Sequence, residues 1–306
     1  GQVSLHAPFI DYSGNCGNCS SGVGPFAIDE GMVKVTAPVT VVRVYNTNTQ
    51  KVLVESVRVI NGKAAVEGDY VIDGVPGCSS RIDIDFRNVV GSTTGKLLPT
   101  GNVRDLLTVE GIGEVPVSIL DVGNPVVFFH AADVGALGTE SRPEINANAV
   151  LLKKIEAIRG AAAGKIGLVK PGEIAEKVSP MRPLAVFVNK AVDYPDYVTG
   201  TMIKAADIEF IARNLMNQSA IETFAATAAI CTAIASVIDG TVVNAVSSGN
   251  GLQSTCVRFG HPRGISETDL AVAKVNGEYV VNKAIMTRTA RRIMDGYIYI
   301  RKALLK

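Results

Sequence analysis

The chain of 306 residues has no tryptophan, and it contains only three histidines and five cysteines. The histidines lie far apart and the cysteines do not form two closely spaced pairs, which argues against a zinc site. No run of lysine or arginine occurs, and the formal net charge is only +1. We therefore expect no metal and no nucleic-acid partner.

Long apolar runs are also missing. None approaches the roughly 18 residues that a membrane span requires. Residues 225–237 come nearest, but this run is rich in alanine and contains threonine, which favours a buried helix. No secretory leader pattern occurs, and an odd number of cysteines fits reduced thiols. These features predict a cytoplasmic protein without a membrane partner.

The chain does contain enough apolar residues for a full core, because 47% of it is hydrophobic. Alternating and helical apolar spacings are mixed along the sequence, which predicts an α+β fold. We expect strands at residues 2–5, 39–45, 52–60, 64–72, 115–120, 125–130, 184–189, 241–246, 254–260, 270–276 and 278–286. We expect helices at residues 20–28, 147–163, 207–215 and 221–237.

Element order suggests an internal duplication. Each half of the chain has many predicted strands and one buried helix of small residues, at 20–28 and 223–237. This pattern favours two similar α+β units.

The stretch 12–27 carries the most chemistry. Gly14 and Gly17 permit tight turns, and Ser20 and Ser21 are suited to cap a helix start. This arrangement places Cys16 at the N-terminal mouth of the helix. The N–H groups and helix dipole there favour bound anions and lower the pKa of a thiol. A carboxylate substrate and a proton-carrying thiol could share this position.

The spacing of Cys16 and Cys19 is compatible with three further roles. The Cys-x-x-Cys pattern could belong to a zinc half-site, but no second pair follows. It could be a redox dithiol, but no βαβ context is evident. Both cysteines could also be inert core residues. The four glycines and two asparagines around them favour a functional loop.

Basic residues elsewhere in the chain are weaker candidates for ligand binding. His261 follows an apolar strand between Arg258 and Arg263, which suggests either a carboxylate-binding corner or a turn with a hydrogen-bonded histidine. The arginines at 288–292 are best explained as ion pairs on a solvated face. Lys96 lacks the spacing of a phosphate loop.

Several motifs follow one another in the order seen in the PrpF-like isomerases, which the chain resembles over essentially its whole length. This family includes 2-methylaconitate cis-trans isomerase, 4-oxalomesaconate tautomerase and 3-methylitaconate Δ-isomerase, and the last branch looks closest. The motifs lie at residues 14–27, 45–49, 72–77, 94–102, 123–125, 260–262 and 289–296.

The resemblance implies a diaminopimelate-epimerase-like fold, in which two similar domains each wrap a β-barrel-like sheet around a central helix. The domains would cover residues 1–114 with 287–306, and residues 115–286. It also implies a homo-oligomer and cofactor-free chemistry, in which a double bond moves within a small unsaturated di- or tricarboxylic acid.

The resemblance makes Cys16 one of two proton carriers. It implies substrate contacts from residues near Cys16, from two other loops and from the second domain. These residues are Asn15, Gly17, Asn18, Ser20, Ser21, Asn46, Thr100, Gly101 and His261.

Two departures from the family pattern matter. The second proton carrier of the family is a lysine upstream of the first strand here, so this chain alone would lack half of the acid/base pair. That segment could exist as a separate chain. In addition, Ile221 stands where relatives often have a histidine, which bears on the choice of substrate.

We therefore predict a cofactor-independent double-bond isomerase. The alternatives are an epimerase or racemase on the same fold, a non-catalytic carboxylate-binding or accessory protein, and a dithiol redox protein. Proton exchange without redox cycling of Cys16 would separate an isomerase from a redox protein.

Overall fold

The structure, a computed structural model, describes residues 1–3, 10–12, 14–297 and 299–302. The described helices are α1 (Gly17–Ser20), α2 (Val23–Asp29), α3 (Ala131–Val134), α4 (Arg142–Ala147), α5 (Ala149–Lys165), α6 (Ala175–Val178) and α7 (Ala226–Val237). Short 3-10 turns occur at Arg87–Val89, Ala205–Asp207 and Gly251–Gln253.

Strands dominate the fold, which is α+β. They are β1 (Gln2–Val3), β2 (Ile10–Asp11), β3 (Val39–Asn46), β4 (Lys51–Ile60), β5 (Lys63–Ala64), β6 (Ile82–Asp85), β7 (Asp105–Val109), β8 (Gly113–Val122), β9 (Asn124–His130), β10 (Leu184–Lys190), β11 (Tyr194–Pro195), β12 (Met202–Ile203), β13 (Phe210–Met216), β14 (Ser219–Ala220), β15 (Cys256–His261), β16 (Gly264–Val275) and β17 (Glu278–Arg288).

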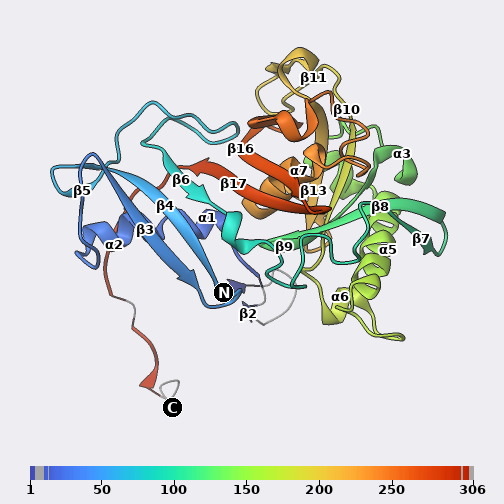
Figure 1. Cartoon of the computed structure of the whole chain (residues 1–306), viewed down its shortest axis with the longest axis horizontal. Coiled ribbons are helices and arrows are strands. Elements are labelled where there is room, and N and C mark those ends of the chain that lie inside the picture. Colours follow the sequence, from blue (N-terminus) through green and yellow to red (C-terminus); the bar gives the residue numbers. More distant parts are fainter. Residues whose placement is uncertain (4–9, 13, 298, 303–306) are drawn as a thin grey trace.

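Within the described ranges, thirteen strands join one mixed sheet whose main path is β3-β4-β6-β17-β16-β15-β13-β10-β9-β8-β7. β9 with β10 and β13 with β15 run parallel, while the other neighbours are antiparallel. Figure 1 shows β3–β5 and α2 on one side of the molecule, and α7, β8–β10 and α5 on the other.

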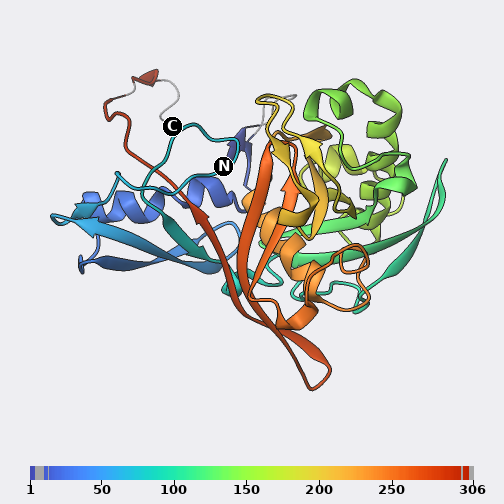
Figure 2. The same cartoon turned by 90° about the horizontal axis from the view of Figure 1, so that it is seen from above.

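Helix α7 lies at the centre of the larger side. All twelve of its residues are buried, because they are small or apolar on every face. The helix packs against β8, β9, β16 and β17, as the view from above illustrates (Figure 2). The predicted buried helix is therefore confirmed, although it begins at Ala226 rather than at residue 221.

The surroundings of strand β9 explain why its sequence is almost continuously apolar. Val126 and Phe128 face the core around α7, whereas Val127 and Phe129 face a second core under α5. A strand covered on both faces needs no polar alternation. The predicted helix at 147–163 is confirmed as α5, which forms that second cover.

One predicted helix is wrong. The amphipathic pattern of residues 207–215 predicts a helix, but Phe210–Met216 is strand β13, paired with β10 and β15. Arg213 is buried, but in the sequence its charge at this position resembles the polar face of an amphipathic helix. Its guanidinium donates to the carbonyls of Glu140 and Ala212 and lies 4.9 Å from the Tyr194 ring centroid, which holds it inside the protein. Its Nη2 has no hydrogen-bond partner among the described residues.

Two predicted strands are also corrected. Residues 241–246 form turns at the end of α7, where Thr241 Oγ1 donates to the Ala235 carbonyl and Asn244 Nδ2 to the Ser236 carbonyl. Local side-chain bonds of this kind compete with strand pairing. In the segment 64–72, only Ala64 pairs in a strand, followed by an isolated bridge between Tyr70 and Ser79.

The other predicted strands are confirmed as β3, β4, β8, β9, β10, β15, β16 and β17. β1 covers Gln2–Val3 of the strand expected at 2–5, and the rest of that strand lies outside the described residues.

Strand β17 joins the two sides of the molecule. It pairs with β16 along most of its length and with β6 through Ile285–Arg288. Near the end of β17, α1 meets α7: a Cβ on Gly17 would lie 2.5 Å from the Ala226 Cβ. Only glycine fits that contact, so the helix that begins after Cys16 lies directly against the start of α7.

Candidate active site

Cys16 is the N-cap of α1, and its Sγ accepts a hydrogen bond from the Cys19 backbone N–H at 3.4 Å. The expected position of the thiol at a helix start is therefore confirmed. The expected serine caps are wrong, because Ser20 is inside α1 and Ser21 follows it as the C-cap. α1 is also only one turn long, so its own dipole is small.

Asn15 holds the cysteine loop (residues 14–18) in place through hydrogen bonds. Its side-chain Oδ1 accepts hydrogen bonds from Asn46 Nδ2 at 2.7 Å and from Ser20 Oγ at 3.3 Å. Its backbone carbonyl accepts from Asn124 Nδ2, which also donates to Thr227 Oγ1 on α7. Asn46 and Ser20 thus hold the loop, and Asn124 ties it to α7.

The thiol of Cys16 borders a small cavity of about 140 Å³, which we call the thiol cavity. One set of its lining residues comes from the cysteine loop, the first residue of β9 and the start of α7: Gly14, Asn15, Cys16, Gly17, Asn18, Asn124, Ala225, Ala226 and Thr227. The other set comes from β10, β13 and their connections: Met181, Arg182, Leu184, Met216, Ile221, Thr223 and Phe224.

The start of α7 gives the thiol cavity a polar end. The N-cap residue Ala225 makes no side-chain cap bond. The first turn of a helix has N–H groups without intrahelical partners, and together with the helix dipole they attract anions. A twelve-residue helix thus supplies the anion-attracting groups that the sequence pattern assigns to the helix after Cys16.

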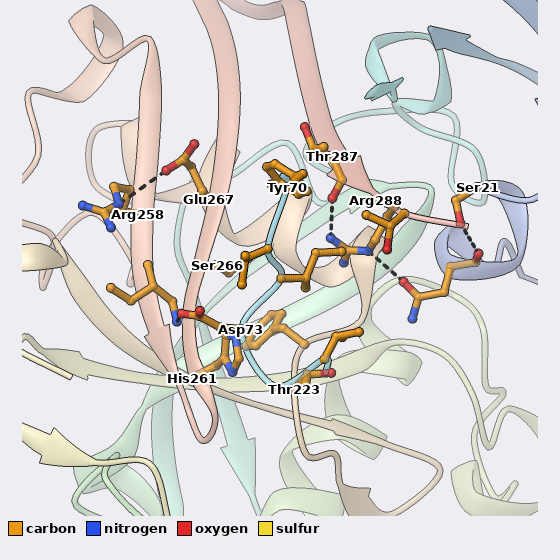
Figure 3. Close-up of a pocket in the computed structure, with 17 residues that line it drawn as sticks. Ser21, Tyr70, Asp73, Thr223, Arg258, His261, Ser266, Glu267, Thr287 and Arg288 are labelled. Carbon is orange, nitrogen blue, oxygen red and sulfur yellow. Dashed lines mark hydrogen bonds and ion pairs between the residues drawn. The ribbon is translucent and has the colours of Figure 1, made fainter. Parts of the chain in front are cut away.

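A second, larger cavity of about 380 Å³ adjoins the first through Asn18, Thr223 and Phe224, which line both. We call it the arginine cavity. It is otherwise lined by Ser21, Tyr70, Val71, Ile72, Asp73, Val75, Arg258, His261, Ile265, Ser266, Glu267, Thr287, Arg288 and Thr289. Figure 3 shows these side chains converging from α1, the 70–75 segment and the strands β15–β17.

Arg288 is the cation at the centre of this cavity. Its Nε donates to Asn18 Oδ1 at 2.9 Å and its Nη1 to the Thr287 carbonyl at 3.0 Å (Figure 3). Within the described part of the chain no carboxylate forms an ion pair with it. Burial lowers the pKa of Arg288 to about 10, so it stays charged at neutral pH. It is therefore well suited to receive an anionic ligand.

The neighbouring arginines are already paired. Arg263 Nε lies 2.9 Å from Asp196 Oδ1, and Arg258 Nε lies 3.5 Å from Glu267 Oε2. The expected carboxylate-binding corner at 258–263 therefore lacks free cations among the described residues. The expectation that the 288–292 arginines form ion pairs holds for Arg292, which binds Glu30 and Asp295, but is wrong for Arg288.

His261 lines the arginine cavity at the β15–β16 turn. Its Nδ1 accepts a hydrogen bond from the Arg263 backbone N–H at 3.2 Å, so the alternative of a turn histidine is confirmed. Burial, with help from the positive charges of Arg213 and Arg288, lowers the pKa of His261 to about 3. The imidazole is therefore neutral at physiological pH and offers hydrogen bonds rather than charge.

The remaining predicted residues divide into two groups. Gly17, Asn18 and Ser21 lie at the cavities, and Ser21 Oγ donates to the Asn18 carbonyl. Thr100 and Gly101 line neither cavity: Thr100 Oγ1 donates to Asp105 Oδ2, and Gly101 serves a turn at φ +80°.

Sequence reasoning missed Arg288, Asn124 and the start of α7. Arg288 ends a long strand in a basic segment, so its sequence context indicated only surface ion pairs. Asn124 falls in the family motif at 123–125, to which the sequence analysis assigned no role in the site. The position of Asn124 directly after a buried strand was the one signal that could have pointed to the site.

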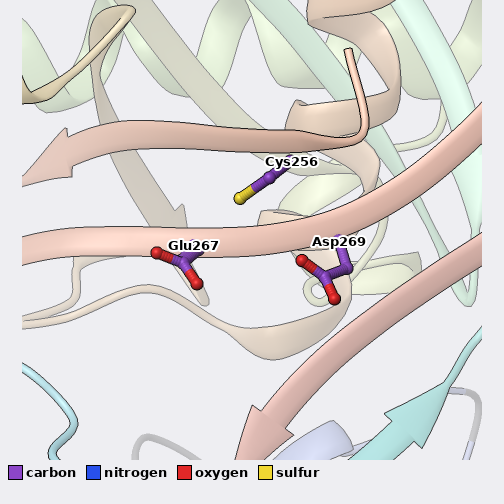
Figure 4. Close-up of side chains that lie close together, drawn as sticks. All are labelled: Cys256, Glu267 and Asp269. Atoms are coloured by element: carbon purple, nitrogen blue, oxygen red, sulfur yellow. The ribbon is translucent and has the colours of Figure 1, made fainter.

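One cluster of potential metal ligands lies on β15 and β16. Cys256, Glu267 and Asp269 hold their ligand atoms within 4.8 Å of one another (Figure 4). Burial and the two carboxylates raise the pKa of Cys256 to about 11. The carboxylates pair with Arg258 and Lys283. Since the thiolate is the form that binds metal, we assign no metal to this cluster.

No described helix combines the length and the apolarity needed to cross a membrane.

All five cysteines are free thiols, and Cys19 is exposed. A hydrogen bond with Cys16 is the main cause that raises the pKa of Cys19.

Comparison with known proteins identifies relatives of the chain. The chain is 46% identical to 3-methylitaconate isomerase of Eubacterium barkeri over 99% of its length and 78% of that protein. It is 35% identical to 2-methyl-aconitate isomerase of Shewanella oneidensis, over 99% of the chain and 77% of the relative. A crystal structure of methylitaconate-delta-isomerase superimposes with a TM-score of 0.86 at 46% identity, covering 100% of this chain and 77% of the other.

The family model described as PrpF protein matches residues 1–301. The relatives are named as isomerases, and the match spans nearly the whole sequence. The chain therefore belongs to the PrpF family, and it is an isomerase.

Proposed function

We propose that this isomerase moves a double bond within a small unsaturated di- or tricarboxylic acid, with Cys16 as one proton carrier. The observation that carries the proposal is the meeting of three features in adjoining cavities. These are the Cys16 thiol, the uncapped start of α7, and the charged Arg288 without a described carboxylate partner. The names of the relatives support this class of substrate.

Arg288 would hold one substrate carboxylate. Asn18 accepts from its Nε and fixes the plane of the guanidinium, and the remaining donors can bind the two oxygens of a carboxylate. The neutral His261 and the hydroxyl of Thr287 complete a polar surface around this position.

The start of α7 would hold the second carboxylate, next to Cys16. Removing a proton from a carbon near that carboxylate spreads negative charge onto its oxygens. Donors already placed at the developing charge stabilise such an intermediate. The polar end of the thiol cavity therefore serves both to bind the acid and to stabilise the dienolate.

The reaction needs no oxidant. A base removes a proton from one allylic carbon, the electrons of that C–H bond shift the double bond by one position, and an acid returns a proton two carbons away. Cys16 is positioned for one of these transfers. The lysine expected from the family pattern stays our prediction for the other.

Finer features of the family complete the proposal. We propose a diaminopimelate-epimerase-like arrangement of two domains, residues 1–114 with 287–306 and residues 115–286, with α2 and α7 as their central helices. A homo-oligomer and a cytoplasmic location remain predictions. The five free thiols support a reducing compartment.

The test is proton exchange in D2O. The chain is incubated with 3-methylitaconate, 2-methylaconitate or 4-oxalomesaconate, and proton NMR follows deuterium incorporation and the position of the double bond. We expect exchange with at least one acid, either by this chain alone or by a version extended with an N-terminal segment that carries the family lysine. Failure of both proteins with all three acids, with correct folding shown by circular dichroism, would argue against the function.

A second measurement does not depend on turnover. Iodoacetamide labels exposed thiols, and a bound acid should slow labelling of Cys16 while leaving the exposed Cys78 unaffected. Equal labelling rates of Cys16 with and without a saturating acid would contradict binding at the thiol cavity.

A further inference from the structure

The thiol cavity has two chemically different sides. Its polar side consists of the cysteine loop, Asn124 and the start of α7, which are linked by hydrogen bonds. Its other side is built from the ends of neighbouring strands. Leu184 begins β10 and Met216 ends β13, and these strands pair through Ala185 and Leu215.

Apolar side chains dominate this second side. We call it the apolar wall, and it consists of Met181, Leu184, Met216, Ile221 and Phe224. Leu184 and Phe224 are buried, whereas Met216 and Ile221 are partly exposed. Ile221 is held in place because its backbone N–H donates to the Asn214 carbonyl. Its side chain is therefore available to the cavity while its backbone is fixed.

We propose that the apolar wall determines substrate specificity by receiving an uncharged alkyl substituent of the acid, with Ile221 as the specificity-determining residue. This inference rests on the proposed function, since it takes the acid to lie across the two cavities. With one carboxylate at Arg288 and the other at the start of α7, the third branch of the substrate faces the wall.

The physical reason is the cost of burying charge. A carboxylate placed against thioether and alkyl groups loses its water without gaining donors. An alkyl group in the same place gains from leaving water. Pockets of this kind discriminate a single methyl group by about 10–200-fold.

Arg182 is the charged residue that also lines the thiol cavity, and it must be considered. Its Nη1 donates to Thr93 Oγ1 at 3.3 Å. If this guanidinium received a third carboxylate, a tricarboxylic acid would bind more tightly than an alkyl dicarboxylic acid. The two outcomes are opposite, so binding measurements decide between them.

The experiment is isothermal titration of the whole chain with three unreactive acids: succinate, methylsuccinate and tricarballylate. We expect methylsuccinate to bind about 10-fold more tightly than succinate, and tricarballylate to bind more weakly than methylsuccinate. Equal affinities for the first two acids, or tightest binding of tricarballylate, would overturn the inference.

Variants locate the effect. Ile221→Asn should remove the preference for methylsuccinate while changing the affinity for succinate less than about threefold. Ile174→Asn, at an exposed isoleucine that lines neither cavity, is the matched control and should keep the preference. If Ile221→Asn fails to fold, Ile221→Ala gives the same test, because it removes the same methyl contacts. A preference retained in a folded Ile221 variant would overturn the role of Ile221.

Failure of the proposed function has a different signature. If no acid binds, or if Arg288→Gln leaves the binding of all three acids unchanged, then the acid does not lie across these cavities. In that case the assignment of the site fails, and the role of the wall fails with it.

Discussion

The two adjoining cavities differ in how they treat charge. The arginine cavity presents a fixed guanidinium, a neutral imidazole and hydroxyl groups. The thiol cavity presents backbone N–H groups on one side and an apolar wall on the other. The comparison shows that the two cavities have different roles. The arginine cavity binds a carboxylate through a full positive charge. The thiol cavity carries the proton transfer and selects the substrate by its shape and polarity.

The largest expected effect comes from a change in the thiol cavity that leaves the arginine cavity intact. Cys16→Ala removes a proton carrier and should lower the rate of exchange by about 10²–10⁴-fold, the usual contribution of a general acid or base. Binding of a saturated acid at Arg288 should persist. Deuterium exchange and titration measure the two properties separately. The exposed Cys78→Ala is the control, and near-normal turnover of Cys16→Ala would rule out its assignment.

The second prediction concerns a change in the arginine cavity that leaves the thiol cavity intact. Arg288→Gln removes the charge but keeps hydrogen-bonding groups, and should raise KM by about 10–100-fold, since hydrogen bonds to charged groups contribute about 1.5–3 kcal/mol. Arg292→Gln, whose partners are Glu30 and Asp295, is the matched control. An unchanged KM for Arg288→Gln would show that the carboxylate binds elsewhere.

The third prediction concerns the junction between the cavities. Gly17→Ala would bring its Cβ within 2.5 Å of the Ala226 Cβ and 3.3 Å of Phe86 Cζ. We expect a loss of about 1–3 kcal/mol in the free energy of unfolding, measured by urea denaturation. In Gly22→Ala the nearest atom is 3.7 Å away, so this control should retain its stability. Ala226→Gly should restore part of the loss in the Gly17→Ala protein, and full stability of Gly17→Ala alone would contradict the contact.

The fourth prediction tests the electrostatic contrast between the two cavities. The pKa of His261 is about 3 in the folded chain and near its ordinary value of 6.5 when unfolded. Below pH 6.5 the unfolded chain therefore binds a proton that the folded chain does not. The free energy of unfolding should fall as the pH decreases from 6.5 towards 3, by up to about 1.4 kcal/mol per unit.

The His261→Asn variant lacks this contribution. Its stability should decrease less steeply with acid than that of the parent chain, in denaturation series at several pH values. Parallel slopes would show that His261 is not held neutral. Between pH 7 and 9 the two slopes should coincide.

The sequence predicts some features better than others for physical reasons. Strand β4 and helix α7 have apolar patterns that their final burial matches, so they could be identified. Strand β13 could not, because the buried Arg213 donates to the carbonyl of Glu140, which only the folded chain brings near.

The site divides in the same way. Cys16 lies among glycines and asparagines, a local pattern that is visible in the sequence. Arg288 differs from the similar Arg258 and Arg263 in one respect. Those two arginines each have a carboxylate partner, whereas Arg288 has none in the described structure. A sequence does not show which of several arginines is paired.

Strand β17 has a consequence for the cooperativity of unfolding. Its pairing with β16 ends at Ile285 and its pairing with β6 runs from Ile285 to Arg288, so Ile285 has strand partners on both sides. The amide hydrogen of Ile285 should therefore exchange with solvent at the rate set by global unfolding. Arg288 pairs with β6 alone, so we expect it to lose its position as soon as that one side opens.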